Sequence, residues 1–200
     1  MALYTKVIKA LKNPEKTFIF IKHKIYWKMV ILLFRKNLTS SVFFESNLPI
    51  EFRFINPHEF SIILDLKHLT EIEIKNRFNN QELCLGAFYD NKLVGYHWCC
   101  FKDIYYPTFN YHHKLDDFSA SLGPVFVDPD YRGNNIRTAL ETQWFLYLAD
   151  HGYKYCETII WAYNKASLKV IDKVEYKALR KITTIKLFNR FVLKHTIEDL

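Results

Sequence analysis

The sequence predicts an α/β domain with a mixed sheet, preceded by a basic helical extension. Strand-like and helix-like runs alternate from residue 51 to residue 188 in the order β-α-β-β-β-α-β-α-β. Half of the residues are hydrophobic and only five of 200 are glycine, which is typical of a packed globular body. The basic charge is concentrated near the N-terminus, which separates that region from the rest.

Charge divides the chain into two parts. Nine Lys/Arg residues and one acid give residues 1–41 a net charge of +8. The remaining 19 bases and 20 acids nearly cancel. A nearly neutral main domain does not favour nucleic-acid binding, so we expect no nucleic-acid partner.

Residues 1–41 are predicted to be helical and amphipathic, with a break at Asn13-Pro14. Apolar side chains recur there at spacings of three and four: Phe18, Ile21, Ile25, Met29 and Leu32. Three lysines fall among them and argue against a membrane-spanning helix: Lys22, Lys24 and Lys28. Two alternatives remain. The helix packs on the domain or a second subunit, or it lies in a membrane interface with its lysines toward anionic lipid.

Residues 1–48 are therefore predicted to form the extension and its linker, and residues 49–200 the main domain. Glu51–Asn56 alternates polar and apolar side chains, as a strand does. Pro57 opens a predicted helical stretch that runs to Phe78. Two strand-like runs follow, Cys84–Tyr89 and Leu93–Phe101, and the turn-forming residues between them predict an antiparallel hairpin.

Residues 102–118 are predicted to be a loop, because they are rich in Tyr, His and Asp. Five further elements are predicted, in the order strand, helix, strand, helix, strand: Ser119–Val127, Asn134–Asp150, Cys156–Ala162, Lys165–Lys173 and Ala178–Phe188. His151-Gly152 closes the first of these helices.

The four cysteines lie in apolar, strand-like runs: Cys84, Cys99, Cys100 and Cys156. They form neither a C-x-x-C pair nor a Cys/His cluster, so we expect buried free thiols and no metal site. The sequence shows no signal peptide. These features predict a cytoplasmic protein, with a peripheral position at the inner face of the membrane as an alternative.

The most informative stretch runs from Leu122 to Arg137. It has the pattern of a strand, a tight turn and a helix N-terminus, with Gly133, Asn134 and Asn135 able to adopt unusual backbone angles. Such a turn aims backbone N–H groups at one point, and the helix dipole adds positive charge, which suits a pyrophosphate. The alternative is a strand-turn-helix unit that binds nothing.

This stretch resembles the acetyl-CoA motif of the Gcn5-related N-acetyltransferases (GNAT). The shared residues are Val127, Pro129, Tyr131, Arg132 and Gly133. The family motif, Arg/Gln-x-x-Gly-x-Gly/Ala, begins here at Arg132. Asn135 replaces its first glycine and Arg137 its last small residue. Asn tolerates the left-handed conformation, so we expect Asn135 to keep the backbone geometry.

A second resemblance lies downstream. The family often carries Asn-x-x-Ser/Ala and then Lys-x-Gly-Phe, where this chain has Asn164 to Ser167 and Lys173 to Tyr176. The resemblance covers residues 51–190. It implies a GNAT fold, with a mixed, mostly antiparallel central sheet flanked by helices. A homodimer is a further hypothesis.

The resemblance implies an acetyltransferase that uses acetyl-CoA as co-substrate and no metal. In this family an amine attacks the thioester directly in a ternary complex. The resemblance implies that the end of the fourth strand, Phe126 and Val127, binds the acyl-pantetheine arm. The turn is implied to bind the pyrophosphate: Arg132, Gly133, Asn134, Asn135, Ile136 and Arg137. Asn164 and Ser167 of the second motif are implied to contact the pantetheine or adenosine side.

The family's usual leaving-group acid is a tyrosine, but Ile171 occupies that position. Tyr163 and Tyr176 are the candidate substitutes, although packing residues are the alternative. His97 is a candidate general base, with a core histidine as the alternative. Further candidate proton acceptors lie in the loop before the fourth strand: His112, His113, Asp116 and Asp117. A chain of water molecules is the alternative to any of these side chains.

The expected acceptor is a primary amine, and an amino sugar of bacterial surface-polysaccharide synthesis is one hypothesis. Its motivation is the basic N-terminus, which resembles those of some bacterial polysaccharide enzymes. The aromatic loop residues suit stacking on a sugar ring: Tyr105, Tyr106, Phe109 and Tyr111. The alternative function is a non-catalytic CoA- or ligand-binding module on a degenerate GNAT fold, associated with the membrane through its N-terminal helix.

Overall fold

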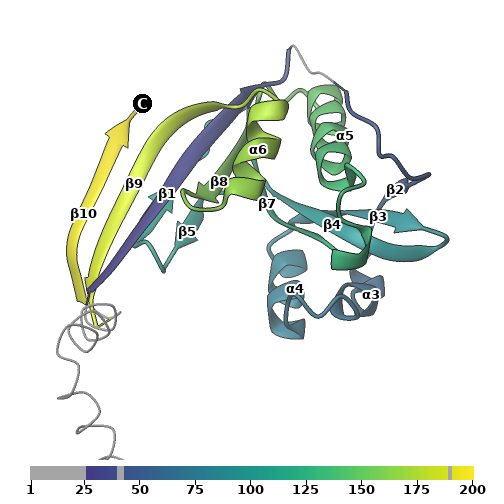
Figure 1. The fold of residues 1–200 in the computed structure, drawn as a ribbon, viewed down its shortest axis with the longest axis horizontal. Coiled ribbons are helices and arrows are strands. Elements are labelled where there is room, and N and C mark those ends of the chain that lie inside the picture. The colour runs from purple at the N-terminus through teal and green to yellow at the C-terminus, as the bar shows by residue number, and fades with distance from the viewer. Residues whose placement is uncertain (1–25, 40–42, 189–190) are drawn as a thin grey trace, which may run out of the picture.

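A computed structural model describes residues 26–39, 43–188 and 191–200 of the chain. Its centre is an eight-stranded sheet in the order β10-β9-β1-β8-β7-β4-β3-β2, with a separate two-stranded ribbon, β5-β6 (Figure 1). Among the strands of the described residues, only β7 and β8 run parallel, and all other pairs are antiparallel. The prediction of a mixed, mostly antiparallel sheet flanked by helices is confirmed.

The predicted N-terminal helix is wrong over residues 26–37. Tyr26–Asn37 is a strand, β1, which lies between β8 (Tyr155–Trp161) and β9 (Lys177–Leu187). Alternate residues Met29, Ile31 and Leu33 are buried on one face of the sheet. Apolar residues on both faces of a buried strand also produce spacings of three and four, which explains the error. Residues 1–25 lie outside the described residues.

The predicted helix from Pro57 to Phe78 is divided into three pieces. After β2 (Glu51–Phe54) come a 3-10 turn at Pro57–Glu59, α3 (Ser61–Leu64) and α4 (Glu71–Asn79). Lys67 has a φ of 52°, which interrupts the helix. Thr70 then starts α4 with a capping box in which its side chain accepts from the Glu73 N–H and Glu73 bonds back.

The predicted hairpin is confirmed. β3 (Leu83–Tyr89) pairs with β4 (Lys92–Cys100) through a turn at Asp90 and Asn91, whose φ angles are 48° and 62°. The predicted loop 102–118 instead contains a short hairpin, β5 (Ile104–Tyr106) and β6 (Tyr111–His113). This hairpin forms because its aromatic side chains find a buried surface on the sheet beside Met29 and Ile31.

The second half follows the predicted order and adds one strand. β7 (Ser119–Val127), a 3-10 turn (Pro129–Tyr131), α5 (Ile136–Asp150), β8 and α6 (Lys165–Lys173) lead into β9, and β10 (Phe191–Asp199) was not predicted. Helices α5 and α6 cover one face of the sheet, and α3 and α4 the other (Figure 1). The four cysteines are free and buried, as predicted.

The sheet opens where the two parallel strands part. The β7-β8 pairing runs from Ser119/Tyr155 to Leu122/Thr158, and the next residue of β7 is Gly123 with a φ of 135°. Beyond it β7 remains paired with β4 on its other side. One edge of Gly123–Val127 therefore faces the opening instead of a neighbouring strand. No helix of the described residues is long and apolar enough to cross a membrane.

Candidate acyl-CoA site

A cavity of about 830 Å³ lies beside this opening, between the end of β7, the start of α5 and α6. Nearly all the predicted ligand-binding residues line it: Phe126, Val127, Arg132, Gly133, Asn135, Ile136, Arg137, Asn164 and Ser167. Residues more than 40 positions apart in the sequence are thus brought to one hollow. Asn134 does not line it. Its carbonyl accepts from the Asn47 N–H at 2.9 Å and holds the segment before β2 in place.

The turn before α5 has the backbone geometry of an anion site. Gly133 and Asn135 have φ angles of 84° and 61°, so Asn135 adopts the left-handed conformation expected of it. No side chain of the described residues caps α5, and the N–H groups of its first turn have no acceptor within the helix. The amide side chain of Asn135 points elsewhere, donating to the Glu45 carbonyl at 2.6 Å and accepting from Lys173 at 2.9 Å.

Arg137 forms part of the cavity wall. Its Nη1 donates to the Ser167 Oγ at 2.6 Å, which joins α5 to α6. Its Nε is buried and has no partner among the described residues. A buried, unpaired guanidinium N–H is costly unless a ligand or water meets it. Arg132 and Lys173 also line the cavity, so three cations surround a space that suits a phosphate-rich ligand.

The second motif shapes the opposite wall. The Asn164 side chain accepts from the Ser167 N–H at 3.1 Å and so caps α6. Ser167 in turn accepts from Arg137, as described above. Both residues therefore organise the cavity through hydrogen bonds within the protein.

His97 does not line the cavity. It is buried against α5, with its Nδ1 3.7 Å from Oε2 of Glu141. Burial lowers the pKa of His97 well below its ordinary value, and the charge of Arg137 adds to this effect. Burial raises the pKa of Glu141. The side chain is therefore a neutral core histidine that lies outside the cavity lining.

The two candidate tyrosines also lie away from the cavity lining. Tyr163 is 73% exposed beside Trp161. Tyr176 is buried, and its hydroxyl donates to Glu141 at 2.7 Å. Burial raises the pKa of Tyr176 well above its ordinary value. Ile171, at the family's tyrosine position, is a core residue.

His68 is the residue that the sequence reasoning missed. It lies between α3 and α4, lines the cavity, and stacks on Phe126 with ring centroids 4.4 Å apart. Its Nδ1 is 2.6 Å from the hydroxyl of buried Tyr96. Partial burial lowers the pKa of His68; the Glu73 charge opposes this shift and the Arg132 charge adds to it. An isolated histidine in a polar connection carries no sequence signal for such a position.

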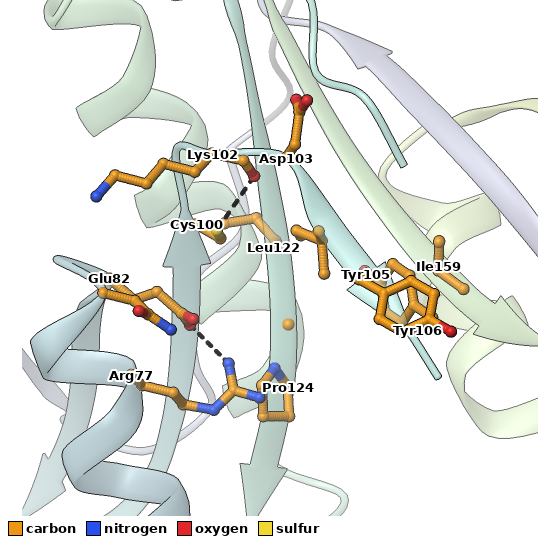
Figure 2. Close-up of a pocket in the computed structure, with 13 residues that line it drawn as sticks. Arg77, Glu82, Cys100, Lys102, Asp103, Tyr105, Tyr106, Leu122, Pro124 and Ile159 are labelled. Atoms are coloured by element: carbon orange, nitrogen blue, oxygen red, sulfur yellow. Dashed lines mark hydrogen bonds and ion pairs between the residues drawn. The ribbon is translucent and has the colours of Figure 1, made fainter. Parts of the chain in front are cut away.

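A second cavity, of about 580 Å³, borders the same opening (Figure 2). Leu122, Gly123 and Pro124 of β7 line it, immediately before the β7 residues that line the first cavity. Figure 2 shows the Arg77 side chain reaching from α4 toward Glu82, with Tyr105 and Tyr106 on the other side near Ile159. The two cavities thus lie along consecutive residues of one strand.

Polar groups dominate one side of the second cavity. Arg77 Nη1 donates to Glu82 at 2.6 Å, and burial raises the pKa of Glu82 although the Arg77 charge acts in the opposite direction. Burial raises the pKa of Tyr106 to about 12, so its hydroxyl remains a donor at neutral pH. Lys102 and Asp103 complete a lining that offers both hydrogen-bond donors and acceptors.

The loop residues that were predicted as proton acceptors make contacts within the protein or are exposed. His113 is buried and lies 2.6 Å from Glu157, and Asp116 pairs with Arg35 at 2.6 Å. His112 stacks on Tyr105, and Asp117 is exposed. None of the four lines either cavity. Phe109 and Tyr111 are packing residues, which leaves Tyr105 and Tyr106 as the aromatic residues of this loop at a cavity.

Residues 50–176 match the model of the Acetyltransferase (GNAT) family. The chain belongs to this family. The match covers the sheet from β2 to the end of α6, including both motifs, and it identifies an acetyltransferase domain of the kind that uses acetyl-CoA.

Solved structures of the family share the fold at low sequence identity. A GCN5-related N-acetyltransferase from Sphaerobacter thermophilus is 14% identical, with 92% of this chain and 58% of that chain covered and a TM-score of 0.62. A GNAT acetyltransferase from Colwellia psychrerythraea is 16% identical, with 81% and 56% covered and a TM-score of 0.60. This chain thus spans somewhat more than half the length of these proteins.

A third structure was solved with CoA bound. The aminoglycoside N-acetyltransferase AAC(6')-Iy in complex with CoA is 14% identical, with 64% of this chain and 91% of that chain covered and a TM-score of 0.51. No curated protein matches the chain.

Proposed function

We propose that this GNAT domain transfers an acetyl group from acetyl-CoA to a primary amine by direct attack in a ternary complex. The carrying observation is the cavity at the β7-β8 opening, where an uncapped helix N-terminus, three cations and a free strand edge meet. The residues fit the ligand, because the buried N–H of Arg137 needs an acceptor and CoA carries several phosphate oxygens.

Each part of the site has a task in this proposal. The first turn of α5 with Arg132 and Arg137 binds the pyrophosphate, and the free edge of β7 near Phe126 binds the pantetheine arm. The amine lone pair attacks the thioester carbonyl carbon, forming the C–N bond. The C–S bond then breaks, CoA leaves as thiolate, and the amine nitrogen loses its proton to water or a base. Backbone N–H groups on the free edge stabilise the developing oxyanion.

The second cavity is proposed to receive the amine. Its position along Leu122, Gly123 and Pro124 places it on the same strand as the acyl arm, and its lining suits a polar acceptor. We propose an amino sugar, because Tyr105 and Tyr106 offer ring faces and hydroxyls while Arg77 and Glu82 offer fixed charges. A bacterial surface-polysaccharide precursor is the specific form of this proposal.

Radiolabelled acetyl-CoA incubated with the full chain and a panel of UDP- and dTDP-amino sugars tests the proposal. Transfer of label to an amino sugar is the expected result. A matched panel of peptides and polyamines is the control. Label found only in a peptide or polyamine would contradict the amino-sugar acceptor while leaving acetyl transfer in place.

A non-catalytic ligand-binding domain is the second candidate. Two observations favour it. Ile171 occupies the family's tyrosine position, and the candidates His97, Tyr163 and Tyr176 all lie away from the cavities. Calorimetry with CoA and the labelling assay together separate the candidates. CoA binding without transfer to any amine would favour the binding module.

A peripheral membrane position is a further part of the proposal. Exposed apolar and basic side chains gather where β1 begins and the β9-β10 connection lies: Trp27, Lys28, Phe188, Phe191, Val192, Leu193 and Lys194. The 25 preceding residues, with six lysines and one acid, attach at the same end. Aromatic and basic groups together suit an anionic bilayer surface.

Co-sedimentation with anionic vesicles tests this part. We expect Phe188→Glu in the full chain to weaken sedimentation and Ile72→Glu, on the exposed face of α4, to leave it unchanged. A chain that begins at residue 49 is unsuitable for this test, because it lacks β1, which lies inside the sheet. Full chain that stays in the supernatant would contradict membrane binding, and a concentration-dependent dimer lost in Phe188→Glu would assign the surface to a second copy.

A further inference from the structure

We infer that His68, held by Tyr96, donates a hydrogen bond through Nε2–H to an amide carbonyl of the pantetheine arm. The inference rests on the proposed function, because it assumes that CoA occupies the cavity beside β7. The pantetheine arm would then contact a side-chain donor from the α3-α4 connection as well as the backbone groups of β7. His68 is thus proposed as a ligand-binding residue.

The tautomer of His68 follows from its partner. Tyr96 is fully buried, and burial raises the pKa of its phenol, so the hydroxyl keeps its proton. A buried hydroxyl hydrogen needs an acceptor, and His68 Nδ1 at 2.6 Å is the partner that the described residues provide. Nδ1 therefore accepts, and in the neutral ring the proton resides on Nε2.

The ring is also fixed in space. One face stacks on Phe126 of β7, which pairs with Tyr96 of β4 on one side and borders the opening on the other. With Nδ1 occupied by Tyr96 and a face covered by Phe126, the Nε2 edge is what remains for the cavity that His68 lines. Among the described residues Nε2 has no hydrogen-bond partner. A donor is thus held beside the strand that would carry the arm.

A donor and a general base have opposite pH signatures here. The charged groups near the ring are Glu73 and Arg132, and the Tyr96 hydroxyl contacts it directly. The pKa of His68 lies below its ordinary value. Nε2 carries a proton both above and below that pKa, so a donor keeps its contact as the pH falls. A base would lose activity as the pH falls through the pKa, because protonation removes its lone pair.

Calorimetry of the full chain with CoA measures the contact. We expect His68→Ala to weaken CoA binding about 5- to 10-fold, the size of one neutral hydrogen bond. His68→Gln, which offers an amide N–H near the Nε2 position, restores most of the affinity. His58→Ala is the matched control, because His58 is exposed and lines neither cavity.

Adenosine 3′,5′-bisphosphate separates the arm from the phosphates, because it lacks pantetheine. We expect His68→Ala to bind it as tightly as the unaltered protein does. Equal weakening toward both ligands would overturn the assignment to the arm. Unchanged CoA affinity in His68→Ala would overturn the inference and leave the proposed function intact, whereas no CoA binding by the unaltered chain would overturn both.

A pH profile and a spectrum complete the test. We expect the His68→Ala loss in CoA affinity to be the same on both sides of the His68 pKa. A limb of kcat/KM that disappears in His68→Ala would instead assign His68 as a base. Long-range ¹⁵N spectra of the imidazole read the tautomer without any ligand. We expect the Nε2–H form, and a mixture in Tyr96→Phe; the Nδ1–H form in the unaltered chain would overturn the inference.

Discussion

Replacing Arg137 with alanine is expected to weaken CoA binding about 10- to 100-fold. The guanidinium lines the cavity at the start of α5, and its buried Nε lacks a partner among the described residues. A charge-assisted hydrogen bond to phosphate contributes about 1.5–3 kcal/mol, which corresponds to that range of affinity. Isothermal titration of CoA into the full chain measures the loss.

Two further variants make this prediction specific. Arg180→Ala removes the same group from the exposed pair with Asp199 and should not change CoA binding. Arg137→Lys keeps the charge but loses the planar fork, so we expect an intermediate affinity. If Arg137→Ala binds CoA as tightly as the unaltered chain, the arginine only joins α5 to Ser167 and takes no part in binding.

Trp144→Ala is expected to lower the free energy of unfolding by about 3–5 kcal/mol. The indole is fully buried, and its Nε1 donates to the His97 carbonyl of β4 at 3.1 Å. It also makes edge contacts with Phe54 and Tyr147. Removing it leaves a cavity and deletes this hydrogen bond where α5 packs on the sheet. Urea unfolding followed by circular dichroism measures the change.

Two further variants provide the comparison. Trp27→Ala alters a side chain that is 45% exposed and should cost much less. Trp144→Phe keeps most of the apolar volume and loses the hydrogen bond, so its cost should lie between the two. A destabilisation of Trp144→Ala no larger than that of Trp27→Ala would show that α5 does not depend on this contact.

The elements with local signals were predicted well. Asp90 and Asn91 mark the β3-β4 turn, and Asn164 marks the start of α6 through its own side-chain cap. The errors arose where one pattern fits two structures. The apolar spacing of β1 matches a helix as well as a strand, and only its pairing with β8 and β9 selects the strand.

The candidate site divides in the same way. The turn from Arg132 to Arg137 could be predicted because its residues are consecutive and their backbone preferences are local. His97 and Tyr176 could not be assigned, because burial against Glu141 depends on how α5 packs on the sheet. His68 carried no signal, since its meaning depends on Tyr96 and Phe126, which are distant in the sequence.

By itself the sequence determined the α/β class, most strands and helices of residues 51–188, and the tight turn before α5. These features depend on local periodicity, turn residues and helix starts. Tertiary structure alone decided that β1 lies inside the sheet, that β7 and β8 part after Leu122, and that His68 lines the cavity. The physical reason is that strand pairing and burial join residues far apart in the chain, and the free energy of those contacts is not encoded in any one segment.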